Sequence, residues 1–512
     1  MLNDRFIRDN NGATKFKEHD RYSWKLKKMS KCLETMVNDI VYGTITLPEY
    51  VKEIIDTQEF QRLRYISQTG LTWYVNPSAT CSRFEHSLGT FYLASKLIKQ
   101  LKDQLEGEDK LIITSEEVKC VELAALCHDL GHGPHSHFWE HAFDPSLKIK
   151  TRKHEDVSVE IFRELVDQKK STSTETIKTI IGLTEEMIDQ ICRMITGEYE
   201  REKDGEKKFL FQIVANKDSG LDVDKLDYLC RDSFYLGWSN NKIHDFKRLI
   251  YFFRVVKDES TKDWHLAMRD RELFKVNEVF SFRHILHRYG CKHRVVKSIE
   301  CMFRNGIKQV IENTVARDEF LETVLEQKVP YNSDIWFSKQ FISKVNDYHL
   351  WHVLKKYAKE MFKNIQERNL YKLLHQSQIQ ITSGNNFDSL DNDISDLQTF
   401  LQRTSGHSNI YLSLSIYSLQ TENKGDPLML MKFYSKENPN KSFDYDKDSL
   451  PNSLSLKEDE IILMVFVERR IFDELEGVLE VFRSLESKSY NSQEDFIMRN
   501  LQTKYLFKEI KY

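Results

Sequence analysis

Apolar residues recur at intervals of three and four positions through most of the first two thirds of the chain. This spacing is typical of amphipathic helices, because residues three or four apart lie on the same helix face. Only 8 prolines and 18 glycines interrupt the 512 residues. The pattern predicts a mainly α-helical body, with its clearest helices at residues 88–101, 118–130, 157–166, 187–195 and 295–315.

The last third of the chain has a different pattern. Residues 409–419 alternate apolar and polar positions, and short apolar runs at 428–434 and 461–467 are further strand candidates, before helical spacing returns at 471–485. The segment 383–409 is rich in Ser, Asn, Asp and Gln and has no clear apolar period, so we expect a loop or disordered insert there. The chain therefore divides into an N-terminal extension (1–35), a helical body (36–375) and a smaller α+β lobe (376–512).

Two local signals flank the most unusual stretch of the body, CHDLGHGPHSH at residues 127–137. Ser82 and Glu85 match a capping box, which would place His86 in the first turn of the following helix. Gly131 is expected to end the helix that carries His128 and Asp129, because glycine accepts a left-handed turn.

The adjacent His128 and Asp129 predict a metal site. Burying an imidazole and a carboxylate side by side is unfavourable unless a partner such as a divalent cation compensates them. His86 and Asp224 supply two more ligands, and the order of the four matches the H…HD…D pattern of HD domains. An isolated HD dipeptide is better explained as polar residues closing a helix. The full set favours one divalent ion, and its ligand types suit iron, zinc, manganese or magnesium.

Further histidines lie close to these ligands in the sequence. His132 and the pair His154-Glu155 are candidates for acids or hydrogen-bond donors in the same cavity, with Glu155 expected to fix the tautomer of an imidazole. His135 and His137 alternate after the glycines, so we expect only one to point inward. We predict that His137 does, and that His135 lies on the surface.

Two cations beside the ligands indicate the class of substrate. Arg83 lies three residues before His86, and Lys225 follows Asp224 directly. A metal with such cations suits a phosphate chain, although either side chain alone is better explained by surface ion pairing. No GxxxxGK sequence occurs, which argues against P-loop chemistry and favours hydrolysis by a metal-activated water.

Composition limits the partners and the cellular compartment that we expect. The 75 basic and 79 acidic side chains give a formal net charge of −4, so no global basic field is available for unselective nucleic-acid binding. The N-terminus lacks a signal-peptide core, the longest apolar run is too short to span a bilayer, and the 8 cysteines form no CxxC pair. We expect an intracellular protein without disulfides, in the nucleus or cytoplasm.

Several longer motifs carry a family resemblance: DTQEFQRLRYISQTG, SRFEHSLGTFYLA, LCHDLGHGPHSH, GLDVDKLDYLCRDSFYLG and KFYSKENPN. With them the chain resembles the sterile-alpha-motif and HD-domain deoxynucleoside triphosphate triphosphohydrolases over roughly residues 36–483. No sterile-alpha-motif module is expected. The resemblance implies hydrolysis of a deoxynucleoside triphosphate to deoxynucleoside and inorganic triphosphate, with one transition metal (Fe, Zn or Mn) at the HD site and Mg²⁺ on the nucleotide phosphates.

The resemblance also implies roles for individual residues. It assigns metal binding to His86, His128, Asp129 and Asp224. It assigns catalysis to His132, His154 and Glu155, with His137 protonating the leaving oxygen. Phosphate contacts fall to Arg83, Lys225 and Arg283, and sugar or base contacts to Tyr228, Asp232 and Gln68.

Family members are activated by nucleotides that bind between subunits and assemble a tetramer. The positions that match a guanine-nucleotide activator site are Asn38, Asp56, Gln61 and Arg64. Those that match a second, deoxynucleotide activator site are Arg248, Arg269, Arg271, Arg294 and Lys436. Arginines on an ordinary solvated helix face would look the same one by one, so the joint occurrence carries the expectation of GTP and dNTP activation and of a homo-oligomer.

Three positions depart from the family pattern. Cys291 stands where the family has a tyrosine packed on the deoxyribose, Lys292 replaces a glutamine, and Thr35 replaces a lysine near the activator site. The smaller thiol leaves room beside the 2′ carbon, so rejection of ribonucleotides is not implied. Two alternatives stay open: an HD phosphodiesterase acting on another nucleotide or a short oligonucleotide, and a non-enzymatic assembly that senses nucleotides or binds single-stranded nucleic acid.

Overall fold

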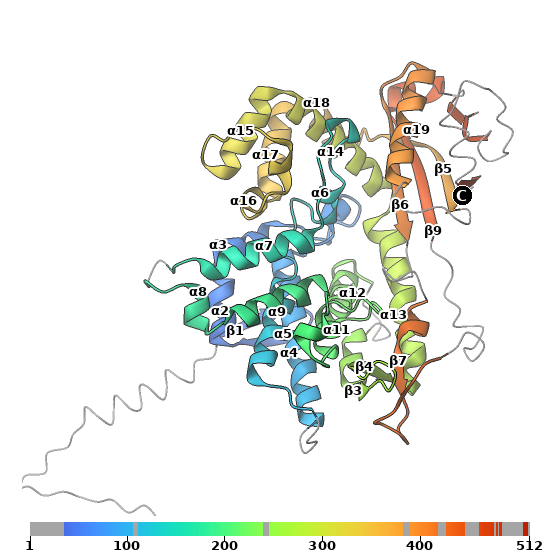
Figure 1. Cartoon of the computed structure of the whole chain (residues 1–512). Coiled ribbons are helices and arrows are strands. Elements are labelled where there is room, and N and C mark those ends of the chain that lie inside the picture. Colours follow the sequence, from blue (N-terminus) through green and yellow to red (C-terminus); the bar gives the residue numbers. More distant parts are fainter. Residues whose placement is uncertain are drawn as a thin grey trace, which may run out of the picture.

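The computed structural model describes most of the chain after residue 34. The described ranges are 35–105, 111–170, 173–238, 245–381, 390–417, 426–445, 460–475, 478–479, 481–483 and 505–509. The predicted N-terminal extension lies almost wholly outside these residues. The architecture is mainly helical with three small sheets, as the sequence predicts (Figure 1).

A compact group of helices forms the centre of the body. The long helix α4 packs along α5, and α5 packs on α9, so that their apolar faces join one continuous core. Further helices of the group close the core from the sides (Figure 1). The bounds are α4 Arg83–Gln104, α5 Ser115–Cys127, α7 His154–Asp167, α8 Ile177–Ile181, α9 Glu185–Thr196, α10 Arg201–Asp204, α11 Phe209–Val214 and α12 Val223–Tyr235.

A second group of helices continues from the first. Helix α14 contacts α15, α17 and α18, and its opposite side meets the C-terminal sheet. The bounds are α13 Leu273–Leu286, α14 Arg294–Glu312, α15 Thr314–Leu325, α16 Lys339–Ile342, α17 Asp347–Tyr357 and α18 Lys359–Gln366. Among these residues lie 3-10 segments and one π-helical turn, η7 at His287–Cys291, which extends α13.

Four of the five predicted helices are confirmed in α4, α5, α7 and α9. The helix predicted at residues 295–315 is confirmed as α14 up to Glu312, but it ends three residues early, because the chain breaks at Asn313 and α15 begins at Thr314. Asn313 has extended backbone angles, and its side chain accepts a hydrogen bond from the amide of Ala316. This cap starts α15 and so divides an apolar pattern that is continuous in the sequence.

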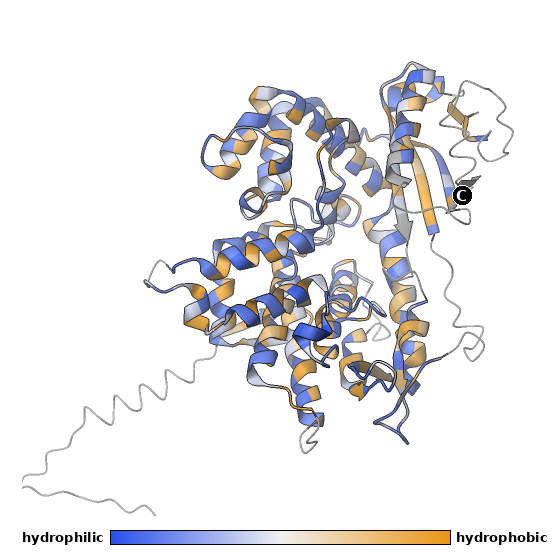
Figure 2. Ribbon diagram, viewed as in Figure 1, coloured by the Kyte–Doolittle hydropathy of each residue, from blue (hydrophilic) through white to orange (hydrophobic). Residues whose placement is uncertain are grey.

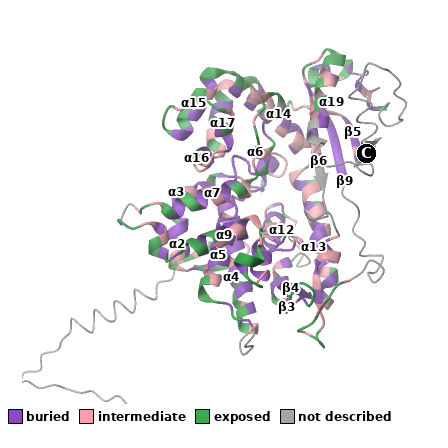
Figure 3. Ribbon diagram, viewed as in Figure 1, coloured by how far each residue is buried: buried purple, intermediate pink, exposed green. Residues whose placement is uncertain are grey.

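The C-terminal sheet has the strand order β10-β5-β9-β6, with antiparallel pairing throughout. The bounds are β5 Lys372–Ile381, β6 Ile410–Tyr417, β9 Glu460–Val467 and β10 Tyr505–Glu509. Central strand β9 is apolar and buried on both faces (Figures 2 and 3). Ile461, Leu463 and Val465 face one core, whereas Ile462 and Met464 face another that includes Cys301 of α14. The strands predicted at 409–419 and 461–467 are therefore confirmed.

The expected loop at 383–409 is wrong for most of its length, because α19 spans Leu390–Ser405. Its buried residues Ile394, Leu397 and Leu401 pack in the same core as β6 and β9. They lie three and four positions apart, so one narrow apolar stripe is enough to hold an otherwise polar helix on the sheet. Residues 383–389 lie outside the described part.

The strand predicted at 428–434 is confirmed only at its end. Residues Pro427–Leu430 form the short helix α20, and β7 covers Lys432–Tyr434. Asp426 caps α20, and Pro427 occupies its first position, where proline is favoured. Strand β7 then pairs with β4 of the body in the sheet β3-β4-β7-β8, whose bounds are β3 Phe253–Lys257, β4 Trp264–Arg269 and β8 Ser442–Phe443. The division of the chain at residue 376 stays a prediction, and β5 crosses it.

A hairpin precedes the helical body. Its strands, β1 Thr35–Asp39 and β2 Gly43–Leu47, pair with each other and lead into α2 Glu49–Ile55 and α3 Gln58–Gln61. The 3-10 segments η1 Arg62–Tyr65 and η2 Gly70–Tyr74 then run to α4. None of the helices in the described part of the chain is long and apolar enough to cross a membrane.

Candidate active site

Four side chains from two helices and one turn converge on one point of the body. His86 stands in the first turn of α4, Asp224 in the first turn of α12, and His128 and Asp129 directly follow α5. Nε2 of His86 lies 2.9 Å from Oδ1 of Asp224 and 3.4 Å from Oδ2 of Asp129. Nε2 of His128 lies 3.5 Å and 3.4 Å from the same two carboxylates. The four predicted metal ligands are therefore neighbours in space.

The chemistry of this group fits a divalent cation. The ligand atoms of His86, His128 and Asp224 lie within 4.8 Å of one another. The Nε2 atoms of both histidines are buried without a hydrogen-bond partner among the described residues. Their Nδ1 atoms are engaged, with Asp227 for His86 and with the carbonyl of Ala125 for His128. A hydrogen bond at Nδ1 fixes the tautomer and the orientation of the ring, so each Nε2 lone pair is left for an ion.

Local sequence explains how the ligands are held. Ser82 accepts a hydrogen bond from the amide of Glu85 at the start of α4, which confirms the predicted cap and the placement of His86. The prediction that Gly131 ends the helix through a left-handed turn is wrong. Helix α5 ends at Cys127, and Gly131 is not among the residues with positive φ. Gly131 instead allows close approach, since its amide donates to Ser158 Oγ at 2.7 Å on α7.

We expect Gly131→Ala to destabilise the fold. An added Cβ would lie 2.1 Å from the carbonyl oxygen of His154 and 2.5 Å from the amide of Ser158, both backbone atoms that cannot move alone. Overpacking of this kind costs roughly 1–3 kcal/mol or more. A denaturant titration should show a lower unfolding midpoint. An unchanged midpoint would contradict the close approach.

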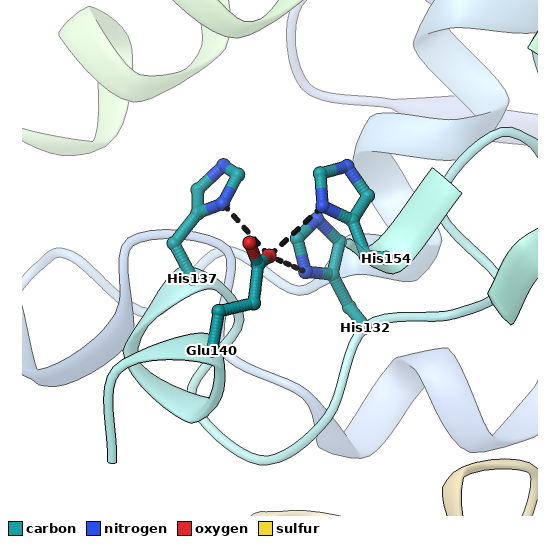
Figure 4. A group of neighbouring side chains, drawn as sticks. All are labelled: His132, His137, Glu140 and His154. Carbon is teal, nitrogen blue, oxygen red and sulfur yellow. Dashed lines mark hydrogen bonds and ion pairs between the residues drawn. The ribbon is translucent and has the colours of Figure 1, made fainter. Parts of the chain in front are cut away.

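A second cluster lies beside the first and contains His132, His137, Glu140 and His154 (Figure 4). Glu140 stands in the short helix α6 (His137–Glu140), and its Oε1 lies 2.9 Å from Nδ1 of His154 and 3.2 Å from Nδ1 of His137. The rings of His132 and His154 stack with their centroids 3.8 Å apart. Figure 4 shows the three imidazoles grouped around the Glu140 carboxylate.

Burial and neighbouring charges shift the pKa values of three residues in this cluster. Burial alone would raise the pKa of Glu140, but hydrogen bonds from His137 and His154 lower it below its usual value. Burial would lower the pKa of His154, yet Glu140 and Glu155 raise it. Burial together with Arg83 keeps the pKa of His132 well below normal. The imidazole of His154, with a raised pKa, thus stacks on that of His132, with a lowered pKa. Such a pair suits general acid–base catalysis.

One prediction about the histidines is wrong. His135 is buried, not on the surface: its Nδ1 lies 3.1 Å from Asp347 and its Nε2 accepts from the indole of Trp351. Glu155 does lie beside an imidazole, with its Oε2 3.4 Å from Nδ1 of His154, and Glu140 lies nearer to the same atom at 2.9 Å. His137 does face the site, as predicted, although its side chain is exposed to the open cavity.

A cavity of about 600 Å³ opens over both clusters. His128, Asp129 and Asp224 line it, with the three predicted phosphate-binding cations Arg83, Lys225 and Arg283. Arg83 is buried, donates to Asp129 Oδ2 at 2.5 Å, and also donates to Ser136 Oγ at 2.8 Å. A buried guanidinium tied to the carboxylate of Asp129, a predicted metal ligand, is more than a surface ion pair, because its charge is not screened by solvent.

The residues predicted to meet the sugar and base line the same cavity: Gln68, Tyr228, Asp232 and Cys291, with Lys292 beside them. Tyr228 accepts a hydrogen bond from Arg283 Nε at 3.1 Å. Burial raises the pKa of Asp232 to about 7 and that of Cys291 to about 12. Burial also lowers the pKa of the Lys292 ammonium to about 7. These groups lose hydration in the cavity, as expected of atoms that a ligand would contact.

The structure describes all the predicted activator residues, which lie on several elements of the chain. Asn38 is exposed on β1, while Asp56, Gln61 and Arg64 lie on one segment from α2 to η1, where Arg64 donates to Gln61 at 2.7 Å. Among the residues matched to the second activator site, Arg248 pairs with Glu272 at 2.7 Å, and the pairing of Arg269 with Tyr434 brings the segment of Lys436 alongside. Arg271 lies directly after Arg269, and Arg294 begins α14.

Three residues of the site were missed from sequence. Glu140 follows His137 by three positions, a spacing that brings two side chains onto one helical face. Asp227 follows Asp224 by the same interval and accepts from Nδ1 of His86 at 2.7 Å. Arg231 follows one turn later and holds Asp227. Intervals of three and four beside the ligands were the available signal.

Comparison with known proteins agrees with this geometry. The HD domain family model matches residues 83–213, which contain three of the four converging residues. The chain is 33% identical over 464 residues to deoxynucleoside triphosphate triphosphohydrolase SAMHD1 of Gallus gallus, covering 85% of this chain and 72% of the relative.

Two further relatives give the same result. The SAMHD1 homolog of Dictyostelium discoideum is 30% identical, with 93% of this chain and 85% of the relative covered. SAMHD1 of Homo sapiens is 32% identical, with 85% and 70% covered. The chain therefore belongs to the SAMHD1 family of HD-domain deoxynucleoside triphosphate triphosphohydrolases.

Proposed function

We propose that this protein hydrolyses deoxynucleoside triphosphates to deoxynucleoside and inorganic triphosphate. The observation that carries the proposal is the convergence of His86, His128, Asp129 and Asp224 beneath a cavity lined by Arg83, Lys225 and Arg283. A bound divalent ion would supply Lewis-acid polarisation of a phosphate oxygen and an acidified water. The names of the relatives agree with this substrate class.

The chain's own residues account for the other requirements of the reaction. The three cations neutralise the phosphate chain, and Arg83 is fixed in place by Asp129 and Ser136. The stacked His132 and His154 lie near Asp129 Oδ1, at 3.3 Å and 3.8 Å, which supports a role for both beside a phosphorus bound at the metal. His137, on the cavity side of Glu140, is in place to protonate the departing 5′ oxygen.

Regulation belongs to the same proposal. GTP would bind at Asn38, Asp56, Gln61 and Arg64, and a deoxynucleotide at the group around Arg269, each assisted by a second copy of the chain. The exposure of Asp56 and Arg64, with the half-buried Gln61 hydrogen-bonded to Arg64, supports a binding surface, since guanine presents both donors and acceptors to such side chains. Assembly up to a tetramer follows from this scheme.

A product assay tests the proposed activity. The purified protein is incubated with each ribo- and deoxynucleoside triphosphate, with and without GTP, and the products are separated by ion-exchange chromatography. We expect inorganic triphosphate and deoxynucleoside in equal amounts, and more of both when GTP is present. Cleavage of a nucleotide ester or oligonucleotide without any triphosphate would instead identify a phosphodiesterase, and no turnover would favour a binding assembly.

Arg64→Ala should weaken activation while leaving the metal site intact. The Arg64 guanidinium lies 3.5 Å from the centre of the Phe84 ring and is exposed on the other side. Losing a charge-assisted contact to a phosphate costs about 1.5–3 kcal/mol, which raises the GTP concentration needed for activation by roughly 10- to 100-fold. Arg163→Ala, which removes a surface pair with Asp189, is the matched control. Full activity of Arg64→Ala without GTP would remove the regulatory proposal.

A further inference from the structure

A buried chain of charged side chains joins the metal ligand His86 to the N-terminal hairpin. His86 donates through Nδ1 to Asp227 Oδ2 at 2.7 Å, and both side chains are fully buried. Arg231 donates to the two oxygens of Asp227 at 2.9 Å and 3.0 Å. The third guanidinium nitrogen reaches Asp39 Oδ2 at 2.7 Å. One imidazole, two carboxylates and one guanidinium thus form a continuous path.

The side chains of this path are tightly packed against helix α4. Gly89 lies one turn after His86 on α4, and a Cβ there would stand 2.0 Å from Asp227 Oδ1 and 2.3 Å from Arg231 Nη2. The missing side chain lets the ion pair lie directly against α4. Asp227 and Arg231 are one turn apart on α12, so a single helix presents both. Arg231 is fully buried, and a buried guanidinium persists only where its partners satisfy it.

At the hairpin end of the path, hydrogen bonds fix the position of Asp39. Asp39 closes strand β1, and its Oδ1 accepts from the amides of Val41 and Tyr42 at 2.8 Å and 2.9 Å. The same carboxylate therefore shapes the turn and holds Arg231. Successive residues of a strand point to opposite faces, and here Asn38 is exposed while Asp39 turns inward. The exposed face of Asn38 belongs to the proposed GTP surface.

We propose that Asp39, Arg231 and Asp227 are positioning residues that couple nucleotide binding at the hairpin to retention of the metal ion at His86. The inference rests on the proposed function. A nucleotide that fixes β1 holds Asp39 against Arg231, which keeps Asp227 on His86 and so keeps Nε2 directed at the ion. Coupling between two binding sites is reciprocal, so the bound ion also strengthens nucleotide binding.

The test measures metal release instead of turnover. Zn²⁺-loaded full-length protein is mixed with a chromophoric chelator, with and without GTP, in Mg²⁺ that exceeds the nucleotide so that GTP itself binds no zinc. For the unmodified protein we expect GTP to slow release by about fivefold or more, which is the lower range of allosteric coupling. An equal release rate with and without GTP would overturn the proposal.

Two variants interrupt the path. Asp39→Asn keeps an oxygen for the amides of Val41 and Tyr42 but removes the charge that holds Arg231. Arg231→Lys keeps a positive charge but cannot hold two carboxylates at once, because an ammonium lacks the planar fork of guanidinium. We expect both variants to release zinc at the same rate with and without GTP. A GTP effect of the original size in Asp39→Asn would overturn the proposal.

Asp204→Asn is the matched control. Asp204 is a buried carboxylate paired with Arg193 at 2.5 Å on α9, so the same chemical change breaks a comparable pair outside the path. We expect this variant to keep the full GTP effect, and its loss would reduce the result to general destabilisation. Triphosphate release from dGTP is measured on the same preparations. Its absence from the unmodified protein would remove the proposed activity, whereas metal retention is judged separately.

Discussion

His128→Ala should abolish hydrolysis of dGTP and remove the bound metal together. His128 contributes a buried Nε2 with no hydrogen-bond partner among the described residues, 3.5 Å from Asp224 and 3.4 Å from Asp129. Without it, two carboxylates and one imidazole remain, and the ion loses one of its four protein ligands. We expect activity to fall by roughly 10³-fold or more, equal to about 4 kcal/mol of transition-state stabilisation. Metal content per chain is measured by mass spectrometry on the same samples.

The comparison variant is His352→Ala. His352 is an exposed histidine of α17, so this variant loses an imidazole that lies outside the candidate active site. This variant should keep both metal and activity. Undiminished turnover in His128→Ala, or loss of turnover with a full complement of metal, would contradict the assigned ligand role.

Glu140→Gln should lower turnover by about 10²-fold while the metal stays bound. Glu140 is the carboxylate nearest Nδ1 of His154, and its charge keeps the pKa of that imidazole raised. The amide preserves shape but removes the charge, so the histidine cluster loses the group that orients His154 and favours its protonated form. General acid–base catalysis contributes about 10²–10⁴-fold, which sets the size of the effect. Steady-state kinetics should show the loss in kcat and little change in KM.

Glu155→Gln gives a matched comparison at the carboxylate that sequence alone favoured. Glu155 stands farther from the same nitrogen, at 3.4 Å, and its side chain is 36% exposed, so solvent screens its charge. We expect a change of no more than about threefold. A large loss in Glu155→Gln with little effect in Glu140→Gln would reverse the two roles.

The elements with strong periodicity could be predicted from the chain, and so could the residues near the metal. Helices α4, α5, α7 and α9 follow from apolar spacing, since each buries one face against its neighbours. The order of His86, His128, Asp129 and Asp224 was sufficient to predict that distant positions converge. The Ser82 cap could be predicted because capping depends only on residues three positions apart.

The errors arise where tertiary contacts decide the outcome. The sequence of α19 looks like a polar loop because only three buried apolar residues hold the helix on the sheet, too few to give a clear helical period. His135 looks like a surface histidine because its partners, Asp347 and Trp351, are more than 200 positions away. Gly131 is required for close approach to α7, which no local pattern encodes. Glu140 lay within reach of the spacing rules, but only the fold shows that it is nearer to His154 than Glu155.

Hydrolysis of dGTP in ¹⁸O-labelled water tests the central claim most directly. If water attacks the α-phosphorus beside His132 and His154, one labelled oxygen enters the inorganic triphosphate and the deoxyguanosine stays unlabelled. The products, separated and weighed by mass spectrometry, should show that distribution. Label in deoxyguanosine, or formation of dGMP or dGDP in place of triphosphate, would contradict the account.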